Sequence, residues 1–138
     1  MLFTYGTLSF PEVFERVVGR RLPSRPARLD GFGCFLFADA VYPGAIPRPG
    51  MSTAGRLYAA IPAAAWCRLD AFEGARYRRE RHSVHLIGGP NAATIPAHVY
   101  VVTEPARNLL APRAWDPDGF RREGLPRLLQ GDDVFGEA

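Results

Sequence analysis

The chain has 138 residues, of which 47% are hydrophobic, and this size is typical of one domain with a single hydrophobic core. Its formal net charge of +3 comes from scattered arginines that form no continuous stripe, which argues against nucleic-acid binding. No apolar run approaches the roughly 20 residues that span a membrane, and the N-terminus lacks a secretory signal pattern, so we expect a soluble, cytoplasmic protein.

The first predicted elements are a strand, a tight turn and a helix. Leu2 to Tyr5 has the pattern of a short buried strand, and the turn Gly6-Thr7-Leu8 follows it. Ser9 and Glu12 have capping-box spacing, so we predict a helix that Ser9 opens and Gly19 ends. Successive N–H groups of the turn can point into one concavity beside the helix N-terminus, an arrangement that favours an anion.

The next part of the chain is predicted to be β-structure. Strand-like segments at 27–29 and 32–37 flank Asp30-Gly31, the strongest short hairpin signal in the sequence. Tyr42-Pro43-Gly44 is expected to form a rigid turn. A further strand is predicted over residues 53–59.

A helix and a hairpin are predicted in the second half of the chain. The helix begins at Pro62, carries apolar residues at helical spacing, and ends at Gly74. The β-rich segments 77–87 and 94–103 should pair as antiparallel strands across a turn at 88–91.

The tail over residues 106–138 is rich in Pro, Arg and Asp and predicts only a short helix near 125–130. The whole chain, residues 1–138, is expected to be one domain. Five or six strands, mostly joined by hairpins, together with one or two helices predict an α+β fold. We expect a small mixed, mostly antiparallel β-barrel with flanking helices.

Several common catalytic and ligand-binding motifs are missing from the sequence. Gly31-Phe32-Gly33 begins like a dinucleotide-binding motif but lies between two strand patterns, and neither a Gly-x-Ser-x-Gly elbow nor a phosphate-binding loop occurs. His82 and His85, three residues apart on a strand, should point to opposite faces, so no metal or other cofactor is expected. Cys34 and Cys67 match no metal or redox spacing, and each is expected to be a buried, unpaired thiol.

Glu73 is the candidate catalytic residue. It ends the predicted second helix, where it faces the negative end of the helix dipole, and packing beside Phe72 would remove water from its carboxyl group. Both effects would raise its pKa above the ~4.3 of free glutamate and allow proton exchange near neutral pH. The alternative is an exposed Glu73 paired with Arg76 or Arg79. Asp70 is a rival acid, but it should point away from Glu73 and pair with an arginine.

Four sequence blocks occur in a specific order and spacing. They are Tyr5-Gly6-Thr7-Leu8, Tyr42-Pro43-Gly44, Gly55-Arg56-Leu57-Tyr58, and Leu69-Asp70-Ala71-Phe72-Glu73-Gly74 followed by Tyr77 and Arg79. Together they resemble the gamma-glutamyl cyclotransferase-like family, and the four-residue Tyr-Gly-Thr-Leu form is closest to its gamma-glutamylamine cyclotransferase branch. The resemblance covers about residues 1–103.

This resemblance implies a barrel enzyme that acts on a small-molecule gamma-glutamyl substrate without a cofactor. The alpha-amine would attack the gamma-amide within the same molecule and release 5-oxoproline with a free amine or amino acid, while Glu73 acts as general acid and base. The implied substrate-binding residues are Tyr5, Gly6, Thr7, Leu8, Tyr42, Pro43, Gly44, Tyr77, Arg79 and Tyr100. The alternative is a module of the same fold that binds a small molecule or a partner without catalysis.

Overall fold

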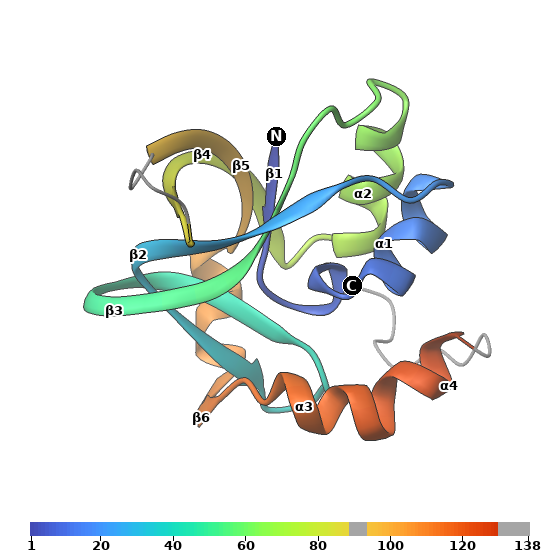
Figure 1. Cartoon of the computed structure of the whole chain (residues 1–138). Coiled ribbons are helices and arrows are strands. Elements are labelled where there is room, and N and C mark those ends of the chain that lie inside the picture. Colours follow the sequence, from blue (N-terminus) through green and yellow to red (C-terminus); the bar gives the residue numbers. More distant parts are fainter. Residues whose placement is uncertain (89–93, 130–138) are drawn as a thin grey trace.

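Six strands form one sheet in the described part of the chain, which is residues 1–88 and 94–129 of the computed structural model (Figure 1). Five of them close into a mixed barrel in the order β1, β3, β2, β4, β5 and back to β1, while β6 pairs with β2. Around this ring only β1 and β5 run parallel. The predicted fold class is therefore confirmed. The strands are β1 (Leu2–Thr4), β2 (Ser24–Phe37), β3 (Pro43–Tyr58), β4 (Tyr77–Leu86), β5 (Thr94–Val102) and β6 (Leu110–Ala114).

The helices are more numerous than the one or two predicted. α1 (Pro11–Val18) and α2 (Ala65–Glu73) pack against each other on one side of the barrel (Figure 1). α3 (Pro117–Gly119), a π-helical segment and α4 (Leu125–Leu129) form a continuous helical run after β6. None of the helices in the described ranges is long and apolar enough to cross a membrane.

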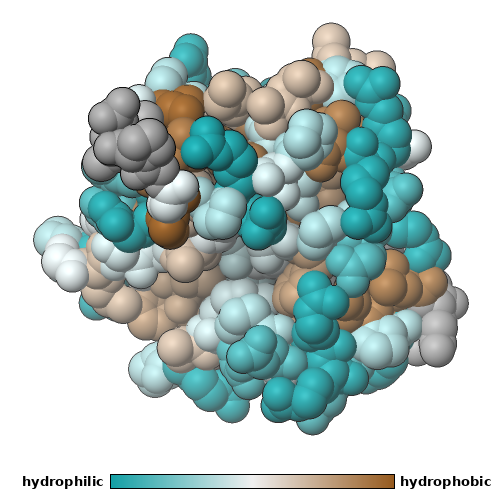
Figure 2. All heavy atoms as spheres, in the orientation of Figure 1, coloured by the Kyte–Doolittle hydropathy of each residue, from teal (hydrophilic) through white to brown (hydrophobic). Residues whose placement is uncertain are grey.

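The hydrophobic core lies partly inside the barrel and partly between the barrel and the helices. Side chains of β1 alternate between the two parts: Leu2 packs with Phe14 of α1 and Leu69 of α2. Phe3 instead belongs to a cluster with members from all five barrel strands, among them Val99. On the face shown in Figure 2, hydrophobic side chains form separate brown patches among hydrophilic ones.

The hairpin predicted at Asp30-Gly31 is wrong. β2 continues through these residues, and its pairing with β3 shifts from Asp30 opposite Ser52 to Phe32 opposite Pro47. One residue of β2 thus stands against four of β3, residues 48–51, which is an irregularity in the register and not a turn of β2. A tight hairpin of the Asp-Gly type needs a positive φ at both central residues, and only Gly31 has one, at +83°. The real turn between β2 and β3 spans residues 38–42, so Pro43 and Gly44 begin a strand.

The first helix begins later than predicted. Ser9 lies in a short 3-10 turn, and its hydroxyl donates to the carbonyl oxygen of Gly6 at 2.5 Å, so it forms no capping box with Glu12. α1 instead begins at Pro11, where a missing N–H leaves no helical hydrogen bond unmade. The predicted end is confirmed, because Gly19 adopts a left-handed φ of +96° and its N–H closes the last turn.

The second helix and the strands after it largely follow the prediction. α2 begins at Ala65, three residues after the predicted Pro62, and Gly74 ends it with a φ of +83°. β4 and β5 pair as antiparallel strands. The turn predicted between them, at 88–91, lies mainly outside the described residues.

The helical run after β6 contacts α1 through an ion pair, in which the guanidinium of Arg121 lies 3.1 Å from the carboxylate of Glu12. The short helix predicted near 125–130 is confirmed over Leu125–Leu129, and Gln130 lies outside the described residues.

The two cysteines are unpaired, and their burial differs. Cys34 is half-buried, whereas Cys67 is exposed, so the burial predicted for Cys67 is wrong. The reason is its place on α2, whose buried residues are Ala65 and Leu69.

Gly55 allows β1 and β3 to pass very close to each other. A Cβ atom at this position would lie 2.0 Å from the carbonyl oxygen of Thr4 and 2.9 Å from the ring of Phe3. The first contact is with backbone, which cannot rotate away as a side chain can. The close approach fixes the end of β1, and therefore the start of the turn that follows it.

We predict that Gly55→Ala destabilises the protein by about 2 to 3 kcal/mol or more, because an added methyl group forces the strands apart. The free energy of unfolding in urea measures this loss. Gly50→Ala is the matched control, since its φ is +86° but no atom lies within 4 Å of the added Cβ. The control should cost only about 1 to 2 kcal/mol, from backbone strain. Equal losses in the two variants would contradict the close-approach explanation.

Candidate active site

Glu73 is the last residue of α2, and its carboxyl group is held in a poorly hydrated environment. The residue is half-buried, and burial raises the pKa of its carboxyl group from an ordinary 4.5 to about 8. Within residues 1–88 and 94–129, no side chain forms an ion pair or a hydrogen bond with this carboxyl group. The alternative of a surface Glu73 paired with Arg76 or Arg79 is therefore wrong.

Four tyrosines from different elements surround the carboxyl group of Glu73. Tyr5 follows β1, Tyr42 precedes β3, Tyr77 begins β4 and Tyr100 lies in β5. Burial raises the phenolic pKa of all four, and the negative charge of Glu73 raises each of them further. The four rings therefore lie within electrostatic range of one carboxylate, although they are far apart in the sequence.

Two of these phenols donate their hydrogen bonds to backbone carbonyl groups. The hydroxyl of Tyr5 donates to the carbonyl oxygen of Tyr100 at 2.5 Å, and the hydroxyl of Tyr77 donates to that of Pro43 at 2.5 Å. A phenol has a single O–H to donate, so neither hydroxyl is available to Glu73. The site thus removes water from Glu73 without supplying these donors in its place, which explains the raised pKa.

A third phenol donates to the other acid of α2. The hydroxyl of Tyr100 donates to the Asp70 carboxylate at 2.6 Å, and the guanidinium of Arg79 lies 3.3 Å from the same carboxylate oxygen. The Arg79 guanidinium also stacks over the ring of Trp66, 4.4 Å from its centroid. Asp70 thus pairs with an arginine, as predicted, and Arg79 lies beside Asp70. The expectation that Asp70 points away from Glu73 is wrong, because residues three apart are neighbours on one side of a helix.

The turn after β1 packs against the beginning of β3. A Cβ atom at Gly6 would lie 3.0 Å from Cγ of Pro43, so two of the sequence blocks meet here. Among the described residues, no acceptor takes the N–H groups of Gly6, Thr7 or Leu8. The side chain of Leu8 is buried in the core, so only its backbone can face a ligand. Gly44 is likewise buried.

An ion pair between Arg76 and Asp39, which the sequence did not predict, holds the part of the site near Tyr42. The guanidinium of Arg76 pairs with Asp39 at 2.8 Å, donates to the hydroxyl of Tyr42 at 3.3 Å, and stacks over the ring of Phe37. Asp39 lies in the turn between β2 and β3, whereas Arg76 follows α2. No local pattern could connect two residues that are 37 positions apart.

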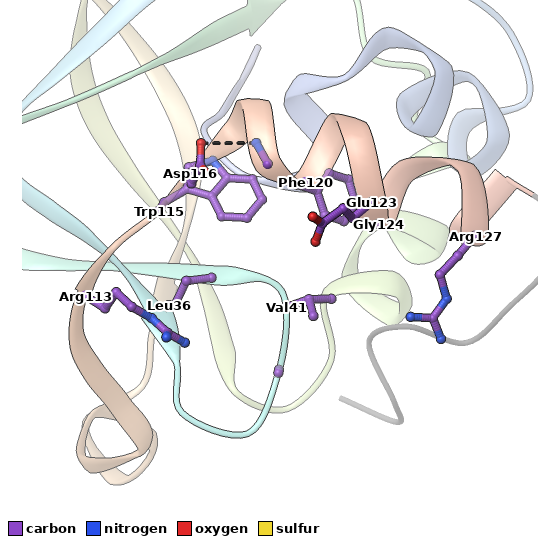
Figure 3. Close-up of a pocket in the computed structure, with 11 residues that line it drawn as sticks. Leu36, Val41, Arg113, Trp115, Asp116, Phe120, Glu123, Gly124 and Arg127 are labelled. Carbon is purple, nitrogen blue, oxygen red and sulfur yellow. Dashed lines mark hydrogen bonds between the residues drawn. The ribbon is translucent and has the colours of Figure 1, made fainter.

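A cavity of about 270 Å³ lies between the turn before β3 and the C-terminal helical run (Figure 3). Figure 3 shows Leu36 and Val41 on one side of it, facing Trp115 and Phe120 on the other. None of the substrate-binding residues implied by the sequence lines this cavity. It adjoins the site through the turn, because Val41 immediately precedes Tyr42. Its lining residues are Leu36, Ala40, Val41, Arg113, Trp115, Asp116, Gly119, Phe120, Glu123, Gly124 and Arg127.

The chain is similar to known proteins in sequence and in fold. A family model described as gamma-glutamyl cyclotransferase, AIG2-like, matches residues 2–117. A solution structure of an Arabidopsis thaliana protein has a TM-score of 0.71 and 21% sequence identity over 94% of this chain and 85% of that chain. A gamma-glutamyl cyclotransferase structure has a TM-score of 0.63 and 15% identity over 99% of this chain and 88% of that one. No curated protein matches the chain. At these identities the structural likeness concerns the fold alone.

We predict that Glu73→Gln becomes more stable relative to the wild type as pH rises. The folded protein keeps the Glu73 proton up to about pH 8, whereas an ordinary carboxyl group releases it near 4.5. The folded state therefore binds more protons in this window, and wild-type stability falls as pH rises through it.

Glutamine does not titrate, so the difference between variant and wild type should grow by a few kcal/mol between about pH 4.5 and pH 8 and then level off. Urea unfolding at several pH values measures it. A difference that does not change with pH would show that Glu73 titrates normally.

Proposed function

Because the chain belongs to the gamma-glutamyl cyclotransferase, AIG2-like family, we propose that it cyclises a gamma-glutamyl substrate with Glu73 as general acid and base. The family resemblance in the sequence is confirmed at this level, and the family implies a small-molecule substrate. The single observation that carries the proposal for Glu73 is its carboxyl group, which is poorly hydrated, unpaired among the described residues and raised in pKa to about 8.

The proposed reaction needs no nucleophile from the protein, because the substrate carries its own. The Glu73 carboxylate takes a proton from the alpha-ammonium group, and the resulting amine attacks the gamma-carbonyl carbon. A C–N bond forms and closes the five-membered lactam, while the original amide C–N bond breaks. Glu73 returns its proton to the departing nitrogen, which also takes up the second proton that the attacking amine loses as it becomes the lactam N–H. The products are therefore 5-oxoproline and a free amine or amino acid with a protonated amino group.

The raised pKa of Glu73 suits both proton transfers. An ordinary carboxylate is a weak base toward an ammonium group, whereas a carboxyl group with a pKa of about 8 can accept that proton and later release it. Placing amine and carbonyl together within one bound molecule can contribute ~7 to 11 kcal/mol, and acid/base catalysis a further ~10²- to 10⁴-fold.

The turn after β1 is the proposed site for the substrate's alpha-carboxylate. The N–H groups of Gly6, Thr7 and Leu8 have no acceptor among the described residues, and oriented backbone N–H groups favour an anion. Tyr42, Pro43 and the other predicted substrate-binding residues would form the walls. Gly44 would contribute only by letting β3 pack closely, because a Cβ there would lie 2.1 Å from Val102.

We predict that Glu73→Gln lowers kcat for 5-oxoproline formation by about 10²- to 10⁴-fold, because the amide cannot exchange the proton. Mass spectrometry of 5-oxoproline released from a panel of gamma-glutamyl amides measures turnover and also identifies the preferred leaving amine. Tyr42→Phe keeps Glu73 intact and serves as the control for a small change in the same wall. A folded Glu73→Gln protein that forms 5-oxoproline at the wild-type rate would exclude Glu73 as the acid and base.

The pH dependence of the wild-type enzyme gives a second prediction. Glu73 must be ionised to act as a base, so kcat/KM should rise with pH and level off above about 8. Steady-state kinetics between pH 5 and 9 test this. A binding module of the same fold would behave differently: gamma-glutamyl compounds or 5-oxoproline would raise its melting temperature, but no 5-oxoproline would form at any pH.

A further inference from the structure

We propose that Asp70 is a positioning residue that holds the Tyr100 hydroxyl away from Glu73 and so leaves the Glu73 carboxyl group without that hydrogen-bond donor. The inference rests on the proposed function for its catalytic consequence, but it can be tested without turnover. The three side chains involved are Asp70 and Glu73 of α2 and Tyr100 of β5.

Tyr100 donates to one acid of α2 and is affected by the charge of the other. Its hydroxyl is 2.6 Å from the Asp70 carboxylate, and the charge of Glu73 raises the pKa of the same phenol. Asp70 and Glu73 are three residues apart in α2, and residues at this spacing are neighbours on one side of a helix. Because a phenol has one O–H, donation to Asp70 excludes donation to Glu73.

The surroundings of Asp70 explain why it receives the hydrogen bond. Its side chain is 47% exposed and keeps part of its hydration, and a hydrogen bond from a phenol to a carboxylate is a strong one. Arg79 lies 3.3 Å from the same oxygen that Tyr100 contacts, and it is itself held over the Trp66 ring. The carboxylate is therefore fixed from two sides.

Among the described residues, Asp70 is the one side chain that accepts a hydrogen bond from the Tyr5, Tyr77 or Tyr100 hydroxyl. Tyr5 and Tyr77 donate to backbone carbonyl groups, which no side-chain substitution removes. A point mutation at residue 70 can therefore release the Tyr100 hydroxyl, whereas no side-chain substitution at an acceptor releases those of Tyr5 and Tyr77.

Several other titratable or charged groups lie around Glu73 and must be considered. The charge of Glu73 acts on Tyr5, Tyr42, Tyr77 and Tyr100. These tyrosines are in turn affected by Cys34 of β2, by Asp39 and Arg76 at the turn before β3, and by Arg79 of β4. Arg76 and Arg79 are paired with Asp39 and Asp70. A test must therefore separate the hydrogen bond of Asp70 from its charge.

The experiment compares Asp70→Ala with Asp70→Asn by ¹³C NMR titration of the Glu73 side-chain carboxyl group. Both variants remove the same charge, but asparagine keeps an acceptor for the Tyr100 hydroxyl. We expect Asp70→Ala to lower the Glu73 pKa from about 8 by roughly one to two units, since the freed phenol can donate to Glu73. Asp70→Asn should shift it much less, and Tyr100→Phe should leave it near 8.

The double variant Asp70→Ala/Tyr100→Phe completes the test, because it removes the freed donor and should return the Glu73 pKa to near 8. Equal shifts in Asp70→Ala and Asp70→Asn, or a shift that persists in the double variant, would overturn the proposal in favour of a charge effect. A large pKa rise in Tyr100→Phe alone would also overturn it, since Tyr100 would then donate to Glu73 in the wild type. This result would overturn the proposal even if Asp70→Ala does not fold.

The kinetic consequence is a separate readout. In Asp70→Ala, the acid limb of kcat/KM should move to lower pH by the same amount as the Glu73 titration, whereas a merely structural role would lower activity equally at all pH values. If no variant and no wild-type sample forms 5-oxoproline, the proposed function fails, but the NMR titrations still decide the role of Asp70.

Discussion

The burial of the Glu73 carboxyl group, to which no side chain in the described part of the molecule donates a hydrogen bond, is the constraint on which the rest of the site depends. Transferring an ionised carboxylate out of water is costly, so the group keeps its proton to a higher pH. The protein maintains this state by placing phenols around Glu73 and giving three of them other acceptors. These phenols exclude water from Glu73 but do not donate hydrogen bonds to its carboxyl group in place of water. The pKa of the carboxyl group is therefore raised to that of a much weaker acid.

The barrel is what makes this arrangement possible. Each of the four tyrosines comes from a different strand or strand end, and closure of the ring through β1 and β5 brings these ends together. Two phenols donate to carbonyl groups of other strands, so the ring positions are fixed by backbone and not by mobile side chains. Gly55 contributes at a distance, because it lets β1 cross close to β3 and sets where the turn at Gly6 begins.

Local signals in the sequence were sufficient for most elements but not for the environment of the candidate site. Gly19 and Gly74 ended helices as predicted, since a left-handed φ at a helix end is a single-residue property. Asp30-Gly31 gave a wrong prediction because the same dipeptide can lie at an irregularity within a strand when pairing continues on both sides of it. Glu73 could be singled out from its place at a helix end, but its tyrosine neighbours and the pairing of Arg76 with Asp39 arise from tertiary contacts that no local spacing encodes.

The two sides of the site are held by interactions of different kinds. Tyr5 and Tyr77 are fixed by short bonds to backbone, whereas the turn that carries Tyr42 is tied to the chain after α2 by the pair of Arg76 and Asp39, whose aspartate is 57% exposed. Exposed ion pairs contribute at most about 1 kcal/mol and weaken as dissolved salt screens them. The two walls therefore differ in their response to the solvent: dissolved salt weakens a contact that holds the turn before Tyr42, but leaves the backbone hydrogen bonds of Tyr5 and Tyr77 unchanged.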